Sequence, residues 1–288
     1  MTRLRSDDIR DVPATLLAYD QALVRMTGRN LSGIACRTCG VSESKLKEIA
    51  PETRVGVIPV TWGLGTIQGF AETVKAIVKH LGFEAYITRE PNVAGLCEAA
   101  EMHSDVIMLS DDDHFSAVHL KTGKSVANAA ATGKVFAVGL DLMAGGLAGQ
   151  SVLVVGCGPV GRYAGFALLQ LGAELSVVDL DRQKACGFAR EARRLLQCEV
   201  GVADALHEAL LKHRYILDAS PAAEIIHEQH VADGTLISAP GVPLGLTGRA
   251  LTASAGRLLH DPLQLGVAAM IVAAVHEARD SASTLIRP

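Results

Sequence analysis

The sequence predicts an α/β protein built from two successive layered units. Three observations indicate this class. Short apolar runs of strand length alternate with helical patterns, aromatic residues make up only 4% of the chain, and a glycine-rich loop follows one of the runs near the middle. Such alternation is typical of parallel strands joined by crossover helices. With 288 residues, the chain has the length of two modest domains.

The first half is expected to hold an N-terminal helix followed by a small α/β domain. Residues 6–28 carry apolar side chains at helical spacing, and Pro13 must lie in the first turns. No clear period runs through residues 29–53, where we expect irregular structure with one short helix at most. Further along, we expect strands at 54–60, 85–88 and 105–109, and helices at 67–82, 96–102 and 129–143.

The second half is expected to form a parallel sheet of its own. A glycine-dense joint at 145–149 places the boundary between domains of residues 1–145 and 146–288. A final Ala/Val/Ile-rich helix over 264–279 is expected to cross back and brace the first domain. The other expected elements are strands at 151–155, 175–179, 216–219 and 236–238, and helices at 160–171, 182–196 and 203–213.

Composition and charge exclude several classes of function. The 27 Lys and Arg are outnumbered by 31 Asp and Glu, so we expect no basic patch for nucleic acid. The longest apolar run, 266–275, is about half of the ~20 residues that cross a bilayer, which excludes a membrane span. Six cysteines and a polar start without a signal segment favour a cytoplasmic protein.

The clearest motif is the loop after the predicted strand 151–155. Glycines occupy its first, third and sixth places. Gly156 allows a tight turn, Gly158 allows a pyrophosphate to approach the backbone, and Gly161 allows the following helix to pack closely on the strand. Pro159 and Val160 open the next helix, whose N-terminus stabilises an anion. The motif predicts a Rossmann-like, doubly wound, dinucleotide-binding domain.

An acidic residue after the next strand indicates which dinucleotide binds. Asp179 lies where a carboxylate accepts hydrogen bonds from the adenosine ribose. With Asp181 nearby, a 2′-phosphate would meet two negative charges, which favours NAD over NADP. Arg182 is the counter-argument, since a guanidinium can hold that phosphate. A helix N-cap is the alternative role of Asp179.

Two other segments follow predicted strands, at the edge of a parallel sheet where ligands bind. Residues 238–243, with Pro240, Gly241 and Val242, are expected beside the nicotinamide, or else form a turn imposed by two prolines. The run Asp111-Asp112-Asp113 crowds carboxylates together, which raises the pKa of at least one and suits a catalytic base. A solvated acidic turn and a divalent metal site are the alternatives. For Cys36 and Cys39, we expect ordinary thiols rather than a zinc site.

Beyond these motifs, the chain resembles the dehydrogenases that complete pyrrolysine biosynthesis. The resemblance extends from about residue 4 to 272, and its specific part lies before the glycine loop. It implies an NAD-dependent oxidation of the terminal amine of 3-methylornithyl-Nε-lysine, with loss of ammonia and ring closure to pyrrolysine. The matching segments include 26–28, 55–61 with Gly63 and Gly65, 81–83, 111–112 with Phe115, Asn128, 132–133, 240–243, and 262–263 with Gly266.

The resemblance also implies roles for individual residues. Asp111 or Asp112 would take the proton that the substrate amine must lose, and Asp261 stands where the family has a longer Glu. Trp62 and Leu64 depart from the small or polar residues expected in the glycine-rich turn. The substrate contacts so implied are Leu4, Thr61, Trp62, Gly63, Ile67 and Asn128, and the cofactor contacts include Ser220 and Pro221.

The expected partners are a small-molecule substrate and a second copy of the chain in a homodimer, with no metal. Two alternative functions stay open. One is another NAD-dependent amino-acid or amine dehydrogenase on the same two-domain plan, which the altered turn at residues 62 and 64 would permit. The other is a non-catalytic module that senses NAD.

Overall fold

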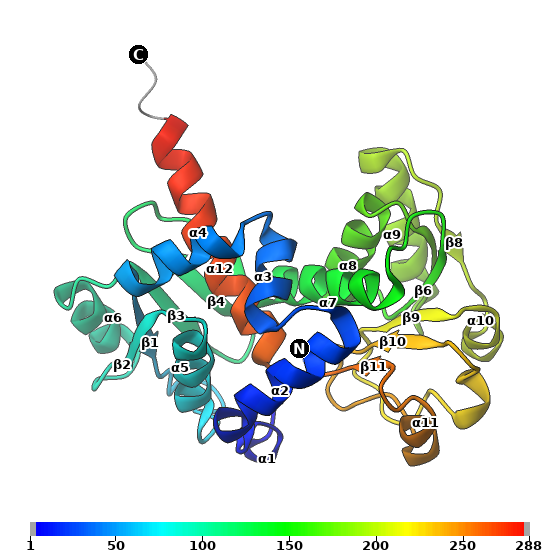
Figure 1. Cartoon of the computed structure of the whole chain (residues 1–288), viewed down its shortest axis with the longest axis horizontal. Helices are drawn as coiled ribbons and strands as arrows, with labels where there is room; N and C mark the ends of the chain where they lie inside the picture. Colours follow the sequence, from blue (N-terminus) through cyan, green and yellow to red (C-terminus); the bar gives the residue numbers. More distant parts are fainter. Residues whose placement is uncertain (1–3, 285–288) are drawn as a thin grey trace.

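The computed structural model describes residues 4–284, with side chains described as far as His276, and contains two sheets (Figure 1). The first has the order β2-β1-β3-β4-β5, and the second the order β11-β10-β9-β6-β7-β8. Helices cover the sheets, so the predicted α/β class is confirmed. In the described part of the chain, no helix is both long and apolar enough to span a membrane.

The first sheet combines parallel and antiparallel strands. β1 (Arg54–Ile58) pairs in parallel with β2 (Glu84–Ile87) and β3 (Val106–Ser110), as the crossover pattern predicts. β4 (Phe115–His119) and β5 (Ser125–Ala127) continue the sheet in antiparallel fashion and were not predicted. The connecting helices are α5 (Phe70–His80) and α6 (Asn92–Glu101).

The N-terminal segment is largely helical, which corrects the expectation of irregular structure at residues 29–53. Asn30 and Ser42 accept hydrogen bonds from the backbone N–H groups of Gly33 and Lys45, so each caps a helix. Pro13 lies in the first turn of its helix, as expected. The helices are α1 (Ser6–Ile9), α2 (Val12–Thr27), α3 (Leu31–Cys39) and α4 (Glu43–Ile49), followed by the 3₁₀ turn Ala50–Glu52.

The second sheet is parallel throughout and doubly wound. β6 (Ser151–Val155) lies between β7 (Glu174–Val178) and β9 (Tyr215–Asp218), and β10 (Leu236–Ser238) follows β9. Two-residue strands at its edges, β8 (Gly201–Val202) and β11 (Leu258–Leu259), were not predicted. The helices are α8 (Pro159–Gln170), α9 (Arg182–Leu196), α10 (Leu206–Lys212) and α11 (Gly248–Ala253), with a 3₁₀ turn at Glu228–His230.

Two helices join the halves of the molecule. α7 (Asn128–Ala144) runs along α8 and also contacts β9 and β10. α12 (Gln264–Thr284) follows the second sheet in sequence but packs against α3, α5, α7 and β4 (Figure 1). Its residues 267–272 are buried without exception, so the last helix supplies core to the first half.

α7 and α8 approach closely because Gly133 has no side chain. A Cβ at this position would lie 2.5 Å from the carbonyl oxygen of Val160 and 2.7 Å from the amide nitrogen of Ala164. Both atoms belong to the backbone of α8, which cannot move aside as a side chain can. Gly133 therefore determines how near the start of α8 lies to α7.

We predict that Gly133→Ala destabilises the fold by about 1–3 kcal/mol, the usual cost of overpacking. Gly248→Ala is the matched control, because a Cβ at Gly248 meets no atom within 4 Å and its helical site favours alanine. Urea unfolding followed by circular dichroism measures both. Equal stability of the two variants would contradict the close approach of the helices.

Candidate functional site

A cavity of about 1020 Å³ gathers most of the residues predicted for the site. Its walls come from both halves of the molecule, and its volume is at the upper end of the range for ligand pockets. Thr61, Gly63 and Gly161 stand outside its lining. The predicted residues that line it are Leu4, Trp62, Ile67, Asp111, Asp112, Asn128, Gly156, Gly158, Pro159, Val160, Asp179, Ser220, Pro221, Pro240, Gly241, Val242 and Asp261.

The glycine loop brings the N-terminus of α8 to the wall of this cavity. Gly156 has a φ of +89°, and a Cβ at Gly161 would clash with the carbonyl oxygen of Gly156. No side chain caps α8, and a Cβ at Gly158 would meet no atom within 4 Å. Gly158, Pro159 and Val160 line the cavity, so the uncapped start of α8 borders open space, which is the environment an anionic group requires.

Asp179 braces this loop from the end of β7. Its carboxylate accepts hydrogen bonds from the backbone N–H groups of Cys157, at 2.7 Å, and Asp181, at 2.8 Å. The N-cap of α9 is Asp181, whose side chain accepts from Gln183 at 3.0 Å, so the alternative role considered for Asp179 belongs to its neighbour. Arg182 forms an ion pair with Asp204.

Asp111, the first of the three consecutive aspartates, is held by backbone N–H groups. The Asp111 carboxylate accepts hydrogen bonds from the backbone N–H groups of Asp113, at 2.8 Å, and His114, at 2.6 Å. These bonds stabilise the charged form and lower the pKa of Asp111 below its usual value. For Asp111, backbone donors thus outweigh the repulsion between neighbouring carboxylates, and the rise in pKa expected for at least one of the three stays a prediction.

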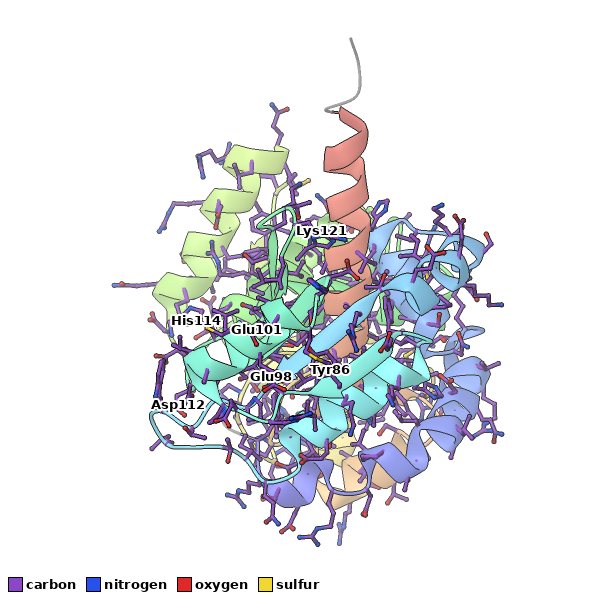
Figure 2. All side chains as sticks on the ribbon, turned by 90° about the vertical axis from the view of Figure 1, so that its left-hand side faces the viewer. Tyr86, Glu98, Glu101, Asp112, His114 and Lys121 are labelled. Atoms are coloured by element: carbon purple, nitrogen blue, oxygen red, sulfur yellow. The ribbon has the colours of Figure 1, made fainter. Side chains whose placement is uncertain are left out.

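Asp112 binds the glycine-rich turn that leads into α5. Its Oδ2 accepts a hydrogen bond from the backbone N–H of Leu64 at 2.8 Å, and a Cβ at Gly63 would clash with the same oxygen. Figure 2 shows Asp112 next to this turn. Trp62, in the same turn, lines the cavity while 62% of its surface is exposed. Asp112 therefore holds the turn that carries Trp62.

Thr61 makes its polar contacts away from the cavity lining. Its backbone N–H donates to Oδ1 of Asn92 at 2.9 Å, and Nδ2 of Asn92 donates to the Thr61 hydroxyl at 2.7 Å. These two bonds tie the end of the β1 segment to the start of α6. Of the residues predicted in this turn, Trp62 reaches the cavity and Thr61 and Gly63 support it.

Asp261 is a buried carboxyl in the wall of the cavity, just before α12. Its oxygens accept a hydrogen bond from the Tyr19 hydroxyl and lie 3.3 Å from the amide nitrogen of Leu265. Burial raises the pKa of Asp261 above its usual value, although the hydrogen bond from Tyr19 opposes the rise. Burial and Asp261 together raise the pKa of Tyr19, so its hydroxyl remains a donor.

Tyr19 is a residue that sequence reasoning missed. It lies on α2, 242 residues before its partner, and no motif marks it. Asn128 begins α7, and its Oδ1 accepts a hydrogen bond from the Thr132 hydroxyl at 3.0 Å. The cavity wall thus combines a buried acid, an amide and the turn held by Asp112.

The cysteines of the CxxC segment pack within α3. Burial raises the pKa of Cys36 to about 11, so its thiol stays protonated at neutral pH. Cys39 Sγ lies 3.6 Å from the carbonyl oxygen of Ala269. Among the described residues, no group of three His, Cys, Asp or Glu side chains could hold a metal ion.

The opposite pKa shifts of Asp111 and Asp261 predict opposite effects on stability. A raised pKa means that the folded state holds the proton more tightly, so the contribution of Asp261 to the stability of the parent chain is lost as pH rises from about 3 to 7. Asp261→Asn removes that loss, and the variant gains stability relative to the parent over this interval.

The pKa of Asp111 is lowered, so its contribution to stability exists above the unfolded pKa of about 3.9. Asp111→Asn therefore becomes less stable than the parent as pH rises. Urea unfolding across this interval tests both signs, and parallel curves for the two variants would contradict the assignment.

Comparison with known proteins identifies relatives over nearly the whole chain. Residues 8–126 match the family described as pyrrolysine biosynthesis protein PylD, N-terminal domain. The chain is 28% identical over 276 residues to the pyrrolysine synthase of Methanosarcina acetivorans, which covers 94% of this chain and 98% of the relative. It is 29% identical over 273 residues to the pyrrolysine synthase of Methanosarcina barkeri, with coverage of 94% and 97%.

A solved structure shares the architecture at lower identity. The quinate dehydrogenase of Corynebacterium glutamicum, solved in complex with NAD, superposes with a TM-score of 0.54 and 16% identity, covering 77% of this chain and 92% of that one. This likeness concerns the fold and confirms the Rossmann-like second sheet. The resemblance inferred from the sequence is likewise confirmed: residues 8–126 match the PylD N-terminal domain, and 94% of the chain is similar to pyrrolysine synthases.

Proposed function

We propose that this protein is an NAD-dependent dehydrogenase of pyrrolysine biosynthesis. The observation that carries the proposal is that one cavity combines the uncapped N-terminus of α8 with a buried carboxyl whose pKa is raised. The first feature suits a dinucleotide and the second suits proton removal from an amine. The names of the relatives support the pathway.

The residues around the glycine loop fit a nicotinamide dinucleotide. The first N–H groups of α8 would bind its diphosphate, and Asp179 would accept from the adenosine ribose. Arg182 is engaged by Asp204, and Asp181 adds negative charge beside Asp179, so the site favours NAD over NADP. When bound, this cofactor supplies an acceptor for the hydride.

The proposed substrate is 3-methylornithyl-Nε-lysine, whose terminal CH2–NH3⁺ group is oxidised. The ammonium must first lose a proton, because a hydride does not leave readily from carbon next to a positive charge. Removal of the hydride gives an iminium ion. The α-amine of the same substrate attacks its carbon, ammonia leaves, and a five-membered pyrroline ring closes.

We assign the proton acceptor to Asp261 rather than to Asp111. An amine has a pKa near ~10, so a carboxylate with a raised pKa is the better base. Burial raises the pKa of Asp261, whereas backbone N–H donors lower that of Asp111. Tyr19 orients the Asp261 carboxyl through its hydroxyl. Asp112 holds the turn that carries Trp62 against the substrate, and Asn128 binds a polar group of it.

A second candidate function differs only in the substrate. Trp62 lines the cavity from a turn where the family resemblance predicts a small or polar residue, so its indole could select a different amine or amino acid. The cofactor site and the acid–base chemistry would be unchanged. A panel of amines tested beside the dipeptide distinguishes the two candidates.

The direct test mixes the protein, NAD and 3-methylornithyl-Nε-lysine, and follows NADH absorbance and product mass. We expect NADH to form with a product that has lost ammonia and two hydrogens.

Two variants test the roles of the carboxyl groups in this reaction. Asp261→Asn should lower kcat by about 10²-fold or more, the usual contribution of a general base. Asp112→Asn should impair turnover more than NAD binding. Absence of NADH with every amine, despite NAD binding, would favour a sensing module instead.

Loss of the ribose contact should weaken NAD binding without unfolding the protein. We predict that Asp179→Ala raises the Kd for NAD about tenfold, the effect of a lost charge-assisted hydrogen bond. Glu199→Ala is the control, because Glu199 is an exposed carboxylate paired with Arg193 and outside the cavity lining. Isothermal titration calorimetry measures both. Unchanged affinity in Asp179→Ala would remove Asp179 from the cofactor site.

A further inference from the structure

Asp218 is a fully buried carboxyl that no motif or resemblance assigns. It ends β9, in register with Val155 of β6, and has no exposed surface. Its Oδ1 accepts hydrogen bonds from Ser220, with the amide nitrogen at 3.1 Å and the hydroxyl at 2.7 Å. Its Oδ2 has no hydrogen-bond partner within the described structure. A buried carboxyl that is only half satisfied is costly, which suggests a function.

Two segments of the cavity wall meet at this residue. The carboxylate holds Ser220, and Ser220 and Pro221 line the cavity. The backbone carbonyl of Asp218 accepts from the N–H of Gly241 at 3.3 Å, and Pro240, Gly241 and Val242 line the same cavity. Gly241 itself is so close to the carbonyl oxygen of Ser220 that no Cβ would fit. The two segments are therefore in direct backbone contact at Ser220 and Gly241.

The surroundings of the carboxyl are apolar. A Cβ at Gly245 would clash with Oδ2 and lie 3.2 Å from Cγ1 of Ile225, and β6, β10 and residues 240–246 contain no titratable side chain. Burial raises the pKa of Asp218 to about 6, opposed by the two bonds from Ser220 and by His260. α7 and α8 also pack on β9. The titratable groups of α7 are Lys134, which is exposed, and Asp141, which accepts a hydrogen bond from Leu147. Those of α8 are Arg162, which pairs with Glu191, and Tyr163, which is exposed.

We propose that Asp218 is a positioning residue of the cofactor site, which holds the segments at Ser220 and Gly241 in their binding form only while it is charged. Hydrogen bonds to a carboxylate are about twice as strong as those to a neutral acid, so protonation loosens Ser220 and, through it, Gly241. Cofactor affinity then falls as pH decreases through the range in which Asp218 takes up a proton. The inference rests on the cofactor site proposed above.

The test is the Kd of the parent protein for NAD and for NADH between about pH 5 and pH 8, measured by calorimetry. We expect both affinities to fall about tenfold towards low pH, with the change centred near the pKa of Asp218, about 6. In Asp218→Asn, the affinity should be lowered at pH 8 and no longer vary in this range. Asp141→Asn is the matched control, because Asp141 is also buried and also accepts a backbone hydrogen bond, but lies outside the cavity lining.

Ser220→Ala provides a second variant that keeps the carboxyl. Its hydroxyl lowers the pKa of Asp218, so its removal should move the midpoint of the affinity change to higher pH, a shift that a purely structural role would not produce. An unchanged midpoint in Ser220→Ala, or full pH dependence in Asp218→Asn, would overturn the inference. So would a loss confined to NAD, which would assign the effect to attraction of the charged ring. A parent protein that binds neither form at pH 8 would instead refute the proposed function itself.

Discussion

The arrangement of the whole site depends on the contact between the start of α8 and the end of β6. Gly161 lies against the carbonyl oxygen of Gly156 with no room for a Cβ, which places the first turn of the helix at the edge of the sheet. Gly133 then allows α7 to lie against the same turn. Because α7 begins at Asn128, two close backbone approaches bring the uncapped N-terminus of α8 and Asn128 to one cavity.

Within that cavity, local surroundings rather than residue type separate the roles of the carboxyl groups. Asp111 receives two backbone hydrogen bonds and has a lowered pKa, whereas Asp261 is buried and has a raised one. A single cavity therefore contains one acid suited to remain charged and one suited to exchange a proton. This division suits the proposed amine oxidation, in which the substrate would arrive protonated and leave as an imine.

The sequence predicts the parallel strands and the glycine loop well, because both are encoded by neighbouring residues. The helices over 31–39 and 43–49 were missed, since neither shows a clear apolar period; their capping residues Asn30 and Ser42 were the available signal. The Tyr19–Asp261 pair could not be predicted, because its partners are 242 residues apart and meet only when α12 returns to the first half. The pKa of Asp111 depends on backbone geometry, which composition does not reveal.

A crystal structure with NAD tests most directly whether a dinucleotide diphosphate binds at the start of α8. We expect the diphosphate to lie against the backbone N–H groups of Gly158, Val160 and Gly161, with the adenosine ribose at Asp179 and the nicotinamide towards residues 219–221 and 240–242. A complex in which NAD binds outside this cavity, or in which the crevice stays empty at saturating NAD, would contradict it.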